Sequence, residues 1–286
     1  MKEIYNYAKE RFPILPALLF SSLFGFAGIA HISGFRGNAG QIIASAAMIF
    51  LFLLRIRLWD EIKDFYYDSK HHSSRPIQMG VLSLLHIKKA ALVVLGIEIM
   101  IQFFLPYQAV TIFFIALLYS FLMFKNFYIK DFENKSFLLW LLSHQLIFLI
   151  YIYYIFSIGS TNFFSPKTQS DIWMMLSLFL PTLIYEIGRK VKHRISSAGY
   201  NTDDTYIYRW GETKSYIFLF FLFYFQALST FMIFHHFSSF YILQILAILI
   251  ATLFYFISRK RAIATSNKWS IALGMYGFLV LSFYFL

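Results

Sequence analysis

Long apolar segments separated by shorter polar ones make up most of this chain. Nine of them approach or exceed the roughly 20 residues that a helix needs to cross a bilayer. They cover about 12–32, 41–59, 85–105, 107–124, 136–157, 171–188, 214–235, 238–257 and 269–286. Because a membrane-spanning helix satisfies its own backbone polar groups, the pattern predicts an all-α polytopic membrane protein with a single transmembrane domain over residues 1–286.

The composition supports a membrane protein and excludes several kinds of chemistry. Of the 286 residues, 59% are hydrophobic and only 14% are charged, which is not the balance of a soluble globular domain. The chain has no cysteine. Disulfides, thiolate metal sites and cysteine nucleophiles are therefore excluded.

The net charge of +11 could indicate a nucleic-acid partner, but its placement favours another explanation. The N-terminus and the connections after the second, fourth, sixth and eighth segments, with the adjoining helix ends, hold 23 of the 25 Lys and Arg residues. Since basic residues gather on the cytoplasmic side of membrane proteins, we expect a cytoplasmic N-terminus and no nucleic-acid partner.

A cluster of acids follows the second apolar segment. Asp60, Asp64 and Asp68 are spaced by four residues, so on a helix they share one face. Like charges at this spacing repel unless a cation joins them. Mg²⁺ prefers carboxylate oxygens and often completes its shell with substrate phosphates. The pattern favours a metal–phosphate site at the membrane surface, with a solvated acidic helix end as the alternative.

A second polar cluster closes the sixth segment. Glu186, Arg189 and Lys190 lie at helical spacing on one face, and Asp203 and Asp204 follow in the next connection. An acid beside two cations suits a complex of metal and polyanion. The alternative is a basic helix end in which Glu186 simply pairs with Lys190.

Three further residues are candidates on position alone. Tyr119 and Lys125 lie at the cytoplasmic end of the fourth segment, where a lysine can also extend to the interface without any catalytic role. Glu98 lies near the middle of the third segment. An acid inside a membrane marks a functional candidate, and a protonated, hydrogen-bonded glutamate is the alternative.

Together these residues resemble the UbiA superfamily of intramembrane prenyltransferases. That family carries Asn-Asp-x-x-Asp-x-x-x-Asp after its second helix, followed by Arg-Pro and a Gly. The matching residues here are Asp60, Glu61, Asp64, Asp68, Arg75, Pro76 and Gly80. The family also has a Tyr and a Lys after helix four, which Tyr119 and Lys125 resemble. Two departures, Asp60-Glu61 for Asn-Asp and Glu186-x-x-Arg189-Lys190 for the second Asp-rich motif, suggest a variant branch.

The resemblance implies nine helices around a central cavity, with the active site on the cytoplasmic face of a membrane, here expected to be a bacterial inner membrane. It implies Mg²⁺ as cofactor and an isoprenyl diphosphate, reached through membrane lipid, as substrate. The metal ligands would come from Asp60, Glu61, Asp64, Asp68, Glu186, Asp203 and Asp204. The catalytic residues would be Arg75, Tyr119, Lys125, Arg189 and Lys190.

The resemblance leaves the fate of the prenyl group open. Transfer to an unidentified aromatic or lipid acceptor would make the protein a prenyltransferase. Capture by an internal double bond would make it a terpene cyclase, an activity also found in the superfamily. A transporter is a different possibility, but transport sites usually lie near the membrane midplane, whereas most charges here gather at one face. A non-catalytic scaffold would tolerate Asp64→Ala.

Overall fold

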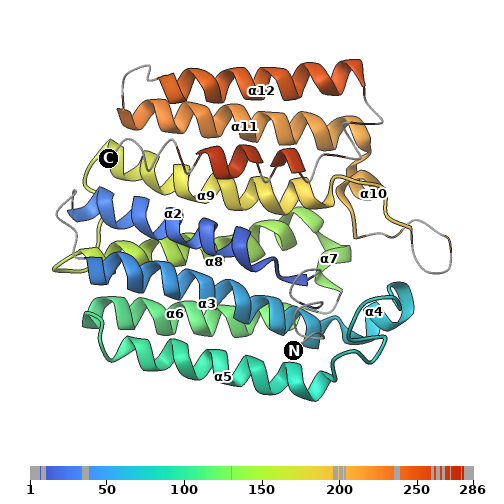
Figure 1. The fold of residues 1–286 in the computed structure, drawn as a ribbon, viewed down its shortest axis with the longest axis horizontal. Helices are drawn as coiled ribbons and strands as arrows, with labels where there is room; N and C mark the ends of the chain where they lie inside the picture. Colours follow the sequence, from blue (N-terminus) through green and yellow to red (C-terminus); the bar gives the residue numbers. More distant parts are fainter. Residues whose placement is uncertain are drawn as a thin grey trace. The chain divides into compact units, whose positions relative to one another are not determined.

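The structure, a computed structural model, consists of helices joined by short connections (Figure 1). It describes residues 7, 11–33, 39–129, 131–195, 199, 202, 204–234, 239–258, 261, 265, 268–270, 272–277 and 279. The chain forms two compact units, Met1–Phe164 and Ser165–Leu286. Each unit is described by itself.

The first unit is built around α3. Its helices are α2 (Ile14–Ser33), α3 (Ala39–Lys63), α4 (Phe65–His71), α5 (Leu84–Gln102), α6 (Tyr107–Phe124), α7 (Phe132–Lys135) and α8 (Phe137–Gly159). Helix α3 packs against α2, α5, α6 and α8. At Gly25 of α2 a Cβ atom would lie 2.8 Å from the backbone nitrogen of Ala46, so a glycine is what lets α2 approach α3 closely.

The second unit is built around α9 and α11. Its helices are α9 (Gln169–Lys190), α10 (Tyr206–Trp210), α11 (Glu212–Phe234) and α12 (Ser239–Ile257). Helix α9 starts with a capping box, in which Thr168 accepts from the backbone of Asp171 and the Asp171 carboxylate accepts from the backbone of Thr168. It packs along α11, which packs in turn against α12.

Six of the described helices are long and apolar enough to cross a membrane, namely α2, α3, α6, α8, α9 and α11. The predicted segment 85–105 is a helix, α5, but its charged residues keep it out of this set. Helix α12 supplies a shorter apolar stretch. Half of the predicted ninth segment, 269–286, lies outside the described residues. The count of nine spans and the cytoplasmic N-terminus therefore stay predictions.

An ion pair between α3 and α5 lies in the interior of the first unit. Arg55 of α3, which the pattern groups with the cytoplasmic charges, is fully buried. Its Nε donates to Oε2 of Glu98 on α5 at 2.5 Å, and Glu98 is equally buried. The partner of the intramembrane acid is therefore an arginine on a neighbouring helix.

Aromatic and polar side chains enclose this pair. The Nη2 atom of Arg55 donates to the hydroxyl of Tyr151 on α8 at 3.2 Å, and its guanidinium carbon lies 4.6 Å from the ring centroid of Trp59. Because isolated charges are costly inside a membrane and persist when paired, this network ties α3, α5 and α8 together.

Candidate functional site

The acidic face begins on α3 and continues across a break into α4. Asp60 lies in the last turn of α3, Asp64 between the two helices and Asp68 in α4. The backbone nitrogen of Asp64 donates to the carbonyl of Asp60, and that of Asp68 to the carbonyl of Asp64, both at 2.8 Å. These four-residue steps continue the helical spacing through the break, so the backbone keeps the register that the sequence predicts.

The surroundings of Asp64 change the protonation of its carboxyl group. Its pKa is raised to about 7, first by burial against neighbouring atoms, then by the negative charge of Asp60, while Lys63 opposes the increase. The side chain still reaches solvent. Water therefore weakens the contribution of burial, and the repulsion from Asp60 adds to it. An added cation would relieve that repulsion.

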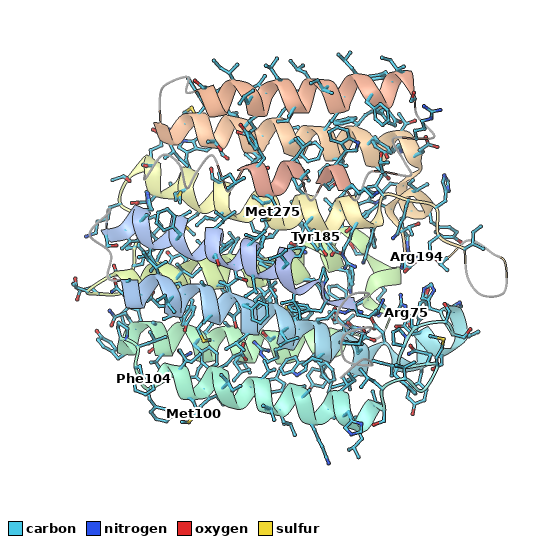
Figure 2. The ribbon with its side chains drawn as sticks, viewed as in Figure 1. Arg75, Met100, Phe104, Tyr185, Arg194 and Met275 are labelled. Atoms are coloured by element: carbon cyan, nitrogen blue, oxygen red, sulfur yellow. The ribbon has the colours of Figure 1, made fainter. Side chains whose placement is uncertain are left out.

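Arginines occupy the other side of the acidic motif. Glu61, 1% exposed, accepts at Oε1 from Nε of Arg11 at 2.7 Å and also from Arg57. Asp68, also buried, is paired with Arg75, which lies beside α4 (Figure 2), and Nη2 of Arg11 is 3.9 Å from Asp68 Oδ2. Helical spacing could have indicated the Arg57–Glu61 pair, whereas Arg11 comes from a distant segment.

The acidic motif fits a magnesium ion in its chemistry. Among the described residues, no group of three or more His, Asp or Glu side chains is already gathered as a cage. Mg²⁺ does not need one, because it typically binds one or two carboxylates and keeps waters and phosphate oxygens. Oε2 of Glu61 is buried without a hydrogen-bond partner in the part of the chain described. Asp60, Glu61, Asp64 and Asp68 would be the ligands.

Tyr119 lies in the last turns of α6, and Lys125 directly follows the helix as its C-cap. The hydroxyl of Tyr119 donates to the carbonyl of Ser143 on α8 at 2.7 Å. Lys125 ends the helix, is exposed, and lies 5.4 Å from the centroid of the Phe124 ring. In this structure Tyr119 therefore joins two helices, and Lys125 is available to solvent.

The connection that follows Lys125 has an unusual backbone. Asn126, Phe127 and Tyr128 have φ angles of 47°, 54° and 57°, all in the left-handed region. Non-glycine residues pay an energetic penalty there, and such conformations concentrate at functional sites. Lys125 comes directly before this loop, so the strained backbone adjoins a candidate catalytic residue.

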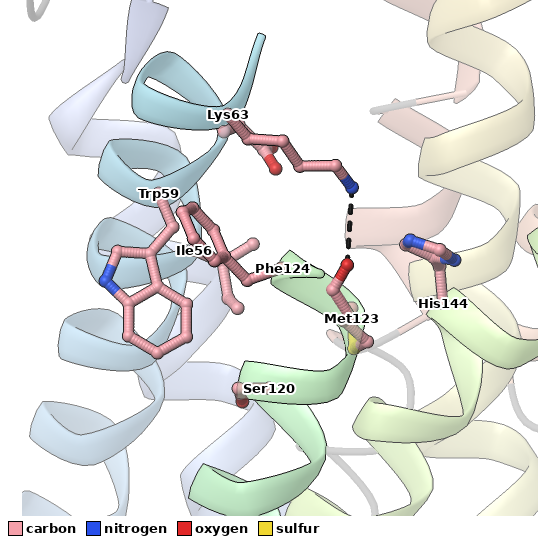
Figure 3. A pocket seen from close by; sticks show the side chains of 8 residues that line it. Ile56, Trp59, Lys63, Ser120, Met123, Phe124 and His144 are labelled. Carbon is pink, nitrogen blue, oxygen red and sulfur yellow. Dashed lines mark hydrogen bonds between the residues drawn. The ribbon is translucent and has the colours of Figure 1, made fainter. Parts of the chain in front are cut away.

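A small cavity adjoins the acidic motif in the first unit (Figure 3). Its volume of about 20 Å³ has room for one water molecule. Its lining residues come from α3, α6 and α8, and are Ile56, Trp59, Asp60, Lys63, Ser120, Met123, Phe124 and His144. Nζ of Lys63 donates to the carbonyl of Met123 at 3.3 Å. The lysine thus ties the end of α3 to the end of α6.

The predicted residues of the second cluster belong to the second unit. Glu186 of α9 lies 2.5 Å from Nη2 of Arg189 and 3.0 Å from Nζ of Lys190, so these three side chains do meet on one helical face. Asp204 pairs instead with Arg194. Asp203 lies outside the described residues. The pairing of Glu186 with both cations is the arrangement expected of a helix end, and an anion would have to compete with it.

Comparison with solved structures identifies the fold. The chain aligns over 99% of its length with a digeranylgeranylglyceryl phosphate synthase (TM-score 0.60, 16% identity, 98% of that chain). It aligns over 94% with a UbiA homologue from Aeropyrum pernix K1 (TM-score 0.67, 12% identity, 98% of that chain).

A third structure was solved with ligands. A UbiA homologue from Archaeoglobus fulgidus, bound to GPP and Mg²⁺, aligns over 94% of this chain and 98% of its own (TM-score 0.51, 13% identity). No protein-family model and no curated protein sequence matches the chain. With six of the described helices able to cross a membrane, the chain is an integral membrane protein that has the fold of the UbiA superfamily.

Proposed function

We propose that this protein is a Mg²⁺-dependent intramembrane prenyltransferase that ionises an isoprenyl diphosphate and transfers the prenyl group to an acceptor. The observation that carries the proposal is the row of Asp60, Asp64 and Asp68 beside Arg75, at one end of α3 and α4 in a chain with the UbiA fold. Mg²⁺ bound there would neutralise the charge that develops on the leaving diphosphate.

Acidic and basic residues would have different roles in this reaction. The carboxylates would hold the metal, and Arg75 and Lys125 would donate to phosphate oxygens. For Arg75 this means sharing its guanidinium between Asp68 and the ligand. In the second motif, Glu186 would be the metal ligand, and Arg189 and Lys190 would be the cations that bind phosphate oxygens. Fixed cations aimed at a developing negative charge are commonly worth a few kcal/mol each in the transition state.

Helix α5 supports a larger number of spans than six. It buries Ala91, Val94 and Glu98 and exposes Leu92 and Val93. An apolar outer face with the acid turned inward is the distribution expected of a helix surrounded by lipid. The charge of Glu98, which lowers its apparent hydropathy, is neutralised by Arg55. We therefore count α5 as a span in the proposed topology.

The proposal is tested by incubating purified protein in nanodiscs with Mg²⁺ and prenyl diphosphates of ten, fifteen and twenty carbons. We expect Mg²⁺-dependent diphosphate release that needs an added membrane extract or aromatic acceptor. Release of a cyclic hydrocarbon without acceptor would instead identify a terpene cyclase. Intact substrate under every condition, with folded protein, would contradict both reactions.

A further inference from the structure

Three guanidinium groups surround two buried carboxylates at the junction of α3 and α4. Glu61 accepts from Arg11 and Arg57 with the same oxygen, Oε1. Asp68 pairs with Arg75, and Arg11 lies between the two acids, 2.7 Å from one and 3.9 Å from the other. Arg11 precedes α2 and is 50 residues from Glu61, so the tertiary fold creates this cluster.

The cluster has more positive than negative charge. Within the cluster three arginines face two carboxylates. When Asp60 and Asp64 of the adjoining row are counted as well, four carboxylates face three arginines, and bound Mg²⁺ would make the whole site net positive. A net positive charge beside a metal site, and only partly open to solvent, stabilises an anion that contacts both the arginines and the metal. The side chains of Arg11, Arg57 and Arg75 keep 15%, 20% and 17% of their surface exposed, so a ligand can reach them.

We infer that Arg11 and Arg57, held in place by Glu61, are further binding residues for the diphosphate group of the substrate. The inference rests on the proposed function and names residues that neither the sequence motifs nor the fold comparison assigns. Arginine suits the role because its planar group presents five N–H donors and can bind a phosphate with two of them.

A purely structural pairing explains the arrangement less well. Buried ion pairs contribute little to stability relative to apolar residues of similar size. Within the described part of the chain, the hydrogen bond from Arg11 to Glu61 uses only its Nε–H. The ion pair of Arg11 with Asp68, at 3.9 Å, is too long for a hydrogen bond. Glu61 thus fixes the orientation of the planar guanidinium through its Nε–H, and the terminal N–H groups of Arg11 can donate to a ligand.

The test uses inorganic diphosphate as the probe, so that binding is measured without turnover. Calorimetry on the full-length protein in nanodiscs with Mg²⁺ present should show about tenfold or greater weakening in Arg11→Ala, the loss expected for a charge-assisted hydrogen bond. Arg57→Ala should behave in the same way. Lys89→Ala, which removes an exposed lysine from α5, is the matched control and should bind as the wild type does.

Mn²⁺ binding without diphosphate distinguishes ligand binding from indirect support of the metal site. Removal of a nearby cation should leave Mn²⁺ affinity unchanged or raise it, whereas loss of a residue that only orients Glu61 or Asp68 would lower it. Because an alanine variant can misfold, Arg11→Lys and Arg57→Lys provide charge-preserving versions, and both should weaken diphosphate binding less than alanine does.

The outcomes separate this inference from the proposed function. Mg²⁺-dependent diphosphate binding by the wild type, with unchanged affinity in all four arginine variants, would overturn the assignment of Arg11 and Arg57 and leave the proposed function standing. Lower Mn²⁺ affinity in the arginine variants would also overturn it. A folded wild-type protein that binds no diphosphate with Mg²⁺ would overturn the proposed function itself.

Discussion

The protonation of Asp64 should control how tightly the acidic row binds metal. Its pKa is raised to about 7 in the metal-free protein by burial and by Asp60. Mg²⁺ needs the ionised carboxylate, so metal affinity should be full above that pKa and should fall as the pH drops through it. Because the Asp64 side chain is exposed to solvent, we expect the midpoint of this change in metal affinity to lie at or below about pH 7.

Isothermal titration with Mg²⁺ between roughly pH 5 and pH 8 measures this dependence. We expect affinity to rise with pH and binding near neutral pH to release protons. Asp64→Asn removes the titrating group and should flatten the profile as well as weaken binding. A wild-type affinity that stays constant across the range would contradict the role of Asp64.

At the scale of pairs of helices, removing one partner of the Arg55–Glu98 ion pair should destabilise the fold strongly. Both side chains are fully buried and lie 2.5 Å apart. Glu98→Gln leaves the guanidinium with no opposing charge, and breaking one partner of a buried pair commonly costs about 3–5 kcal/mol. Thermal unfolding in detergent should show a clear loss of stability.

Two variants define the origin of that loss. Lys89→Gln changes an exposed charge on the same helix and should alter stability by less than about 0.5 kcal/mol. The double variant Arg55→Met with Glu98→Leu removes both charges and should recover most of the stability. If the double variant is less stable than Glu98→Gln, the cost comes from lost packing around Trp59 and Tyr151 and not from an unpaired charge.

The loop after α6 should be strained by its left-handed residues. Tyr128 has a φ of 57° and an exposed side chain, so Tyr128→Gly removes the steric penalty and little packing. Allowing for the greater chain entropy of glycine, we expect a gain of about 0.5–1 kcal/mol in the unfolding free energy. The neighbouring Ile129 has φ of −96°, and Ile129→Gly should destabilise. Equal effects at the two positions would contradict local strain.

Helix periodicity explains why part of the candidate site could be predicted from the sequence. The positions of Asp60, Asp64 and Asp68, and those of Glu186 and Lys190, depend on residues within one or two turns, so their spacing fixes their common face. Some partners of Glu61 and Glu98 are instead far away in the sequence. Arg11 is 50 residues from Glu61 and Arg55 is 43 from Glu98, distances at which only tertiary packing decides which side chains meet.

At the scale of the whole molecule, charge placement predicts an orientation but not the role of each charge. The basic residues indicate a cytoplasmic N-terminus, yet one of those counted, Arg55, lies inside the first unit. The apolar segments predict where helices occur, and α5 shows why length and hydropathy alone do not settle which of them cross the membrane.

Because the chain contains no cysteine, its topology can be mapped with single introduced thiols. Ser74→Cys, between α4 and α5, and Thr161→Cys, between α8 and α9, both replace exposed residues. In intact cells a membrane-impermeant maleimide should label Thr161→Cys directly and Ser74→Cys only after permeabilisation. Labelling of both without permeabilisation would contradict the proposed arrangement.

The most direct test of the account compares Mg²⁺-dependent diphosphate release by the wild type and by Asp64→Asn. This substitution keeps the size of the side chain but removes one negative charge from the proposed metal site. We expect turnover to fall by at least about a hundredfold, the scale for loss of a strong electrostatic contact in the transition state, while the fold is unchanged by circular dichroism. Full activity in Asp64→Asn would contradict the metal–diphosphate site.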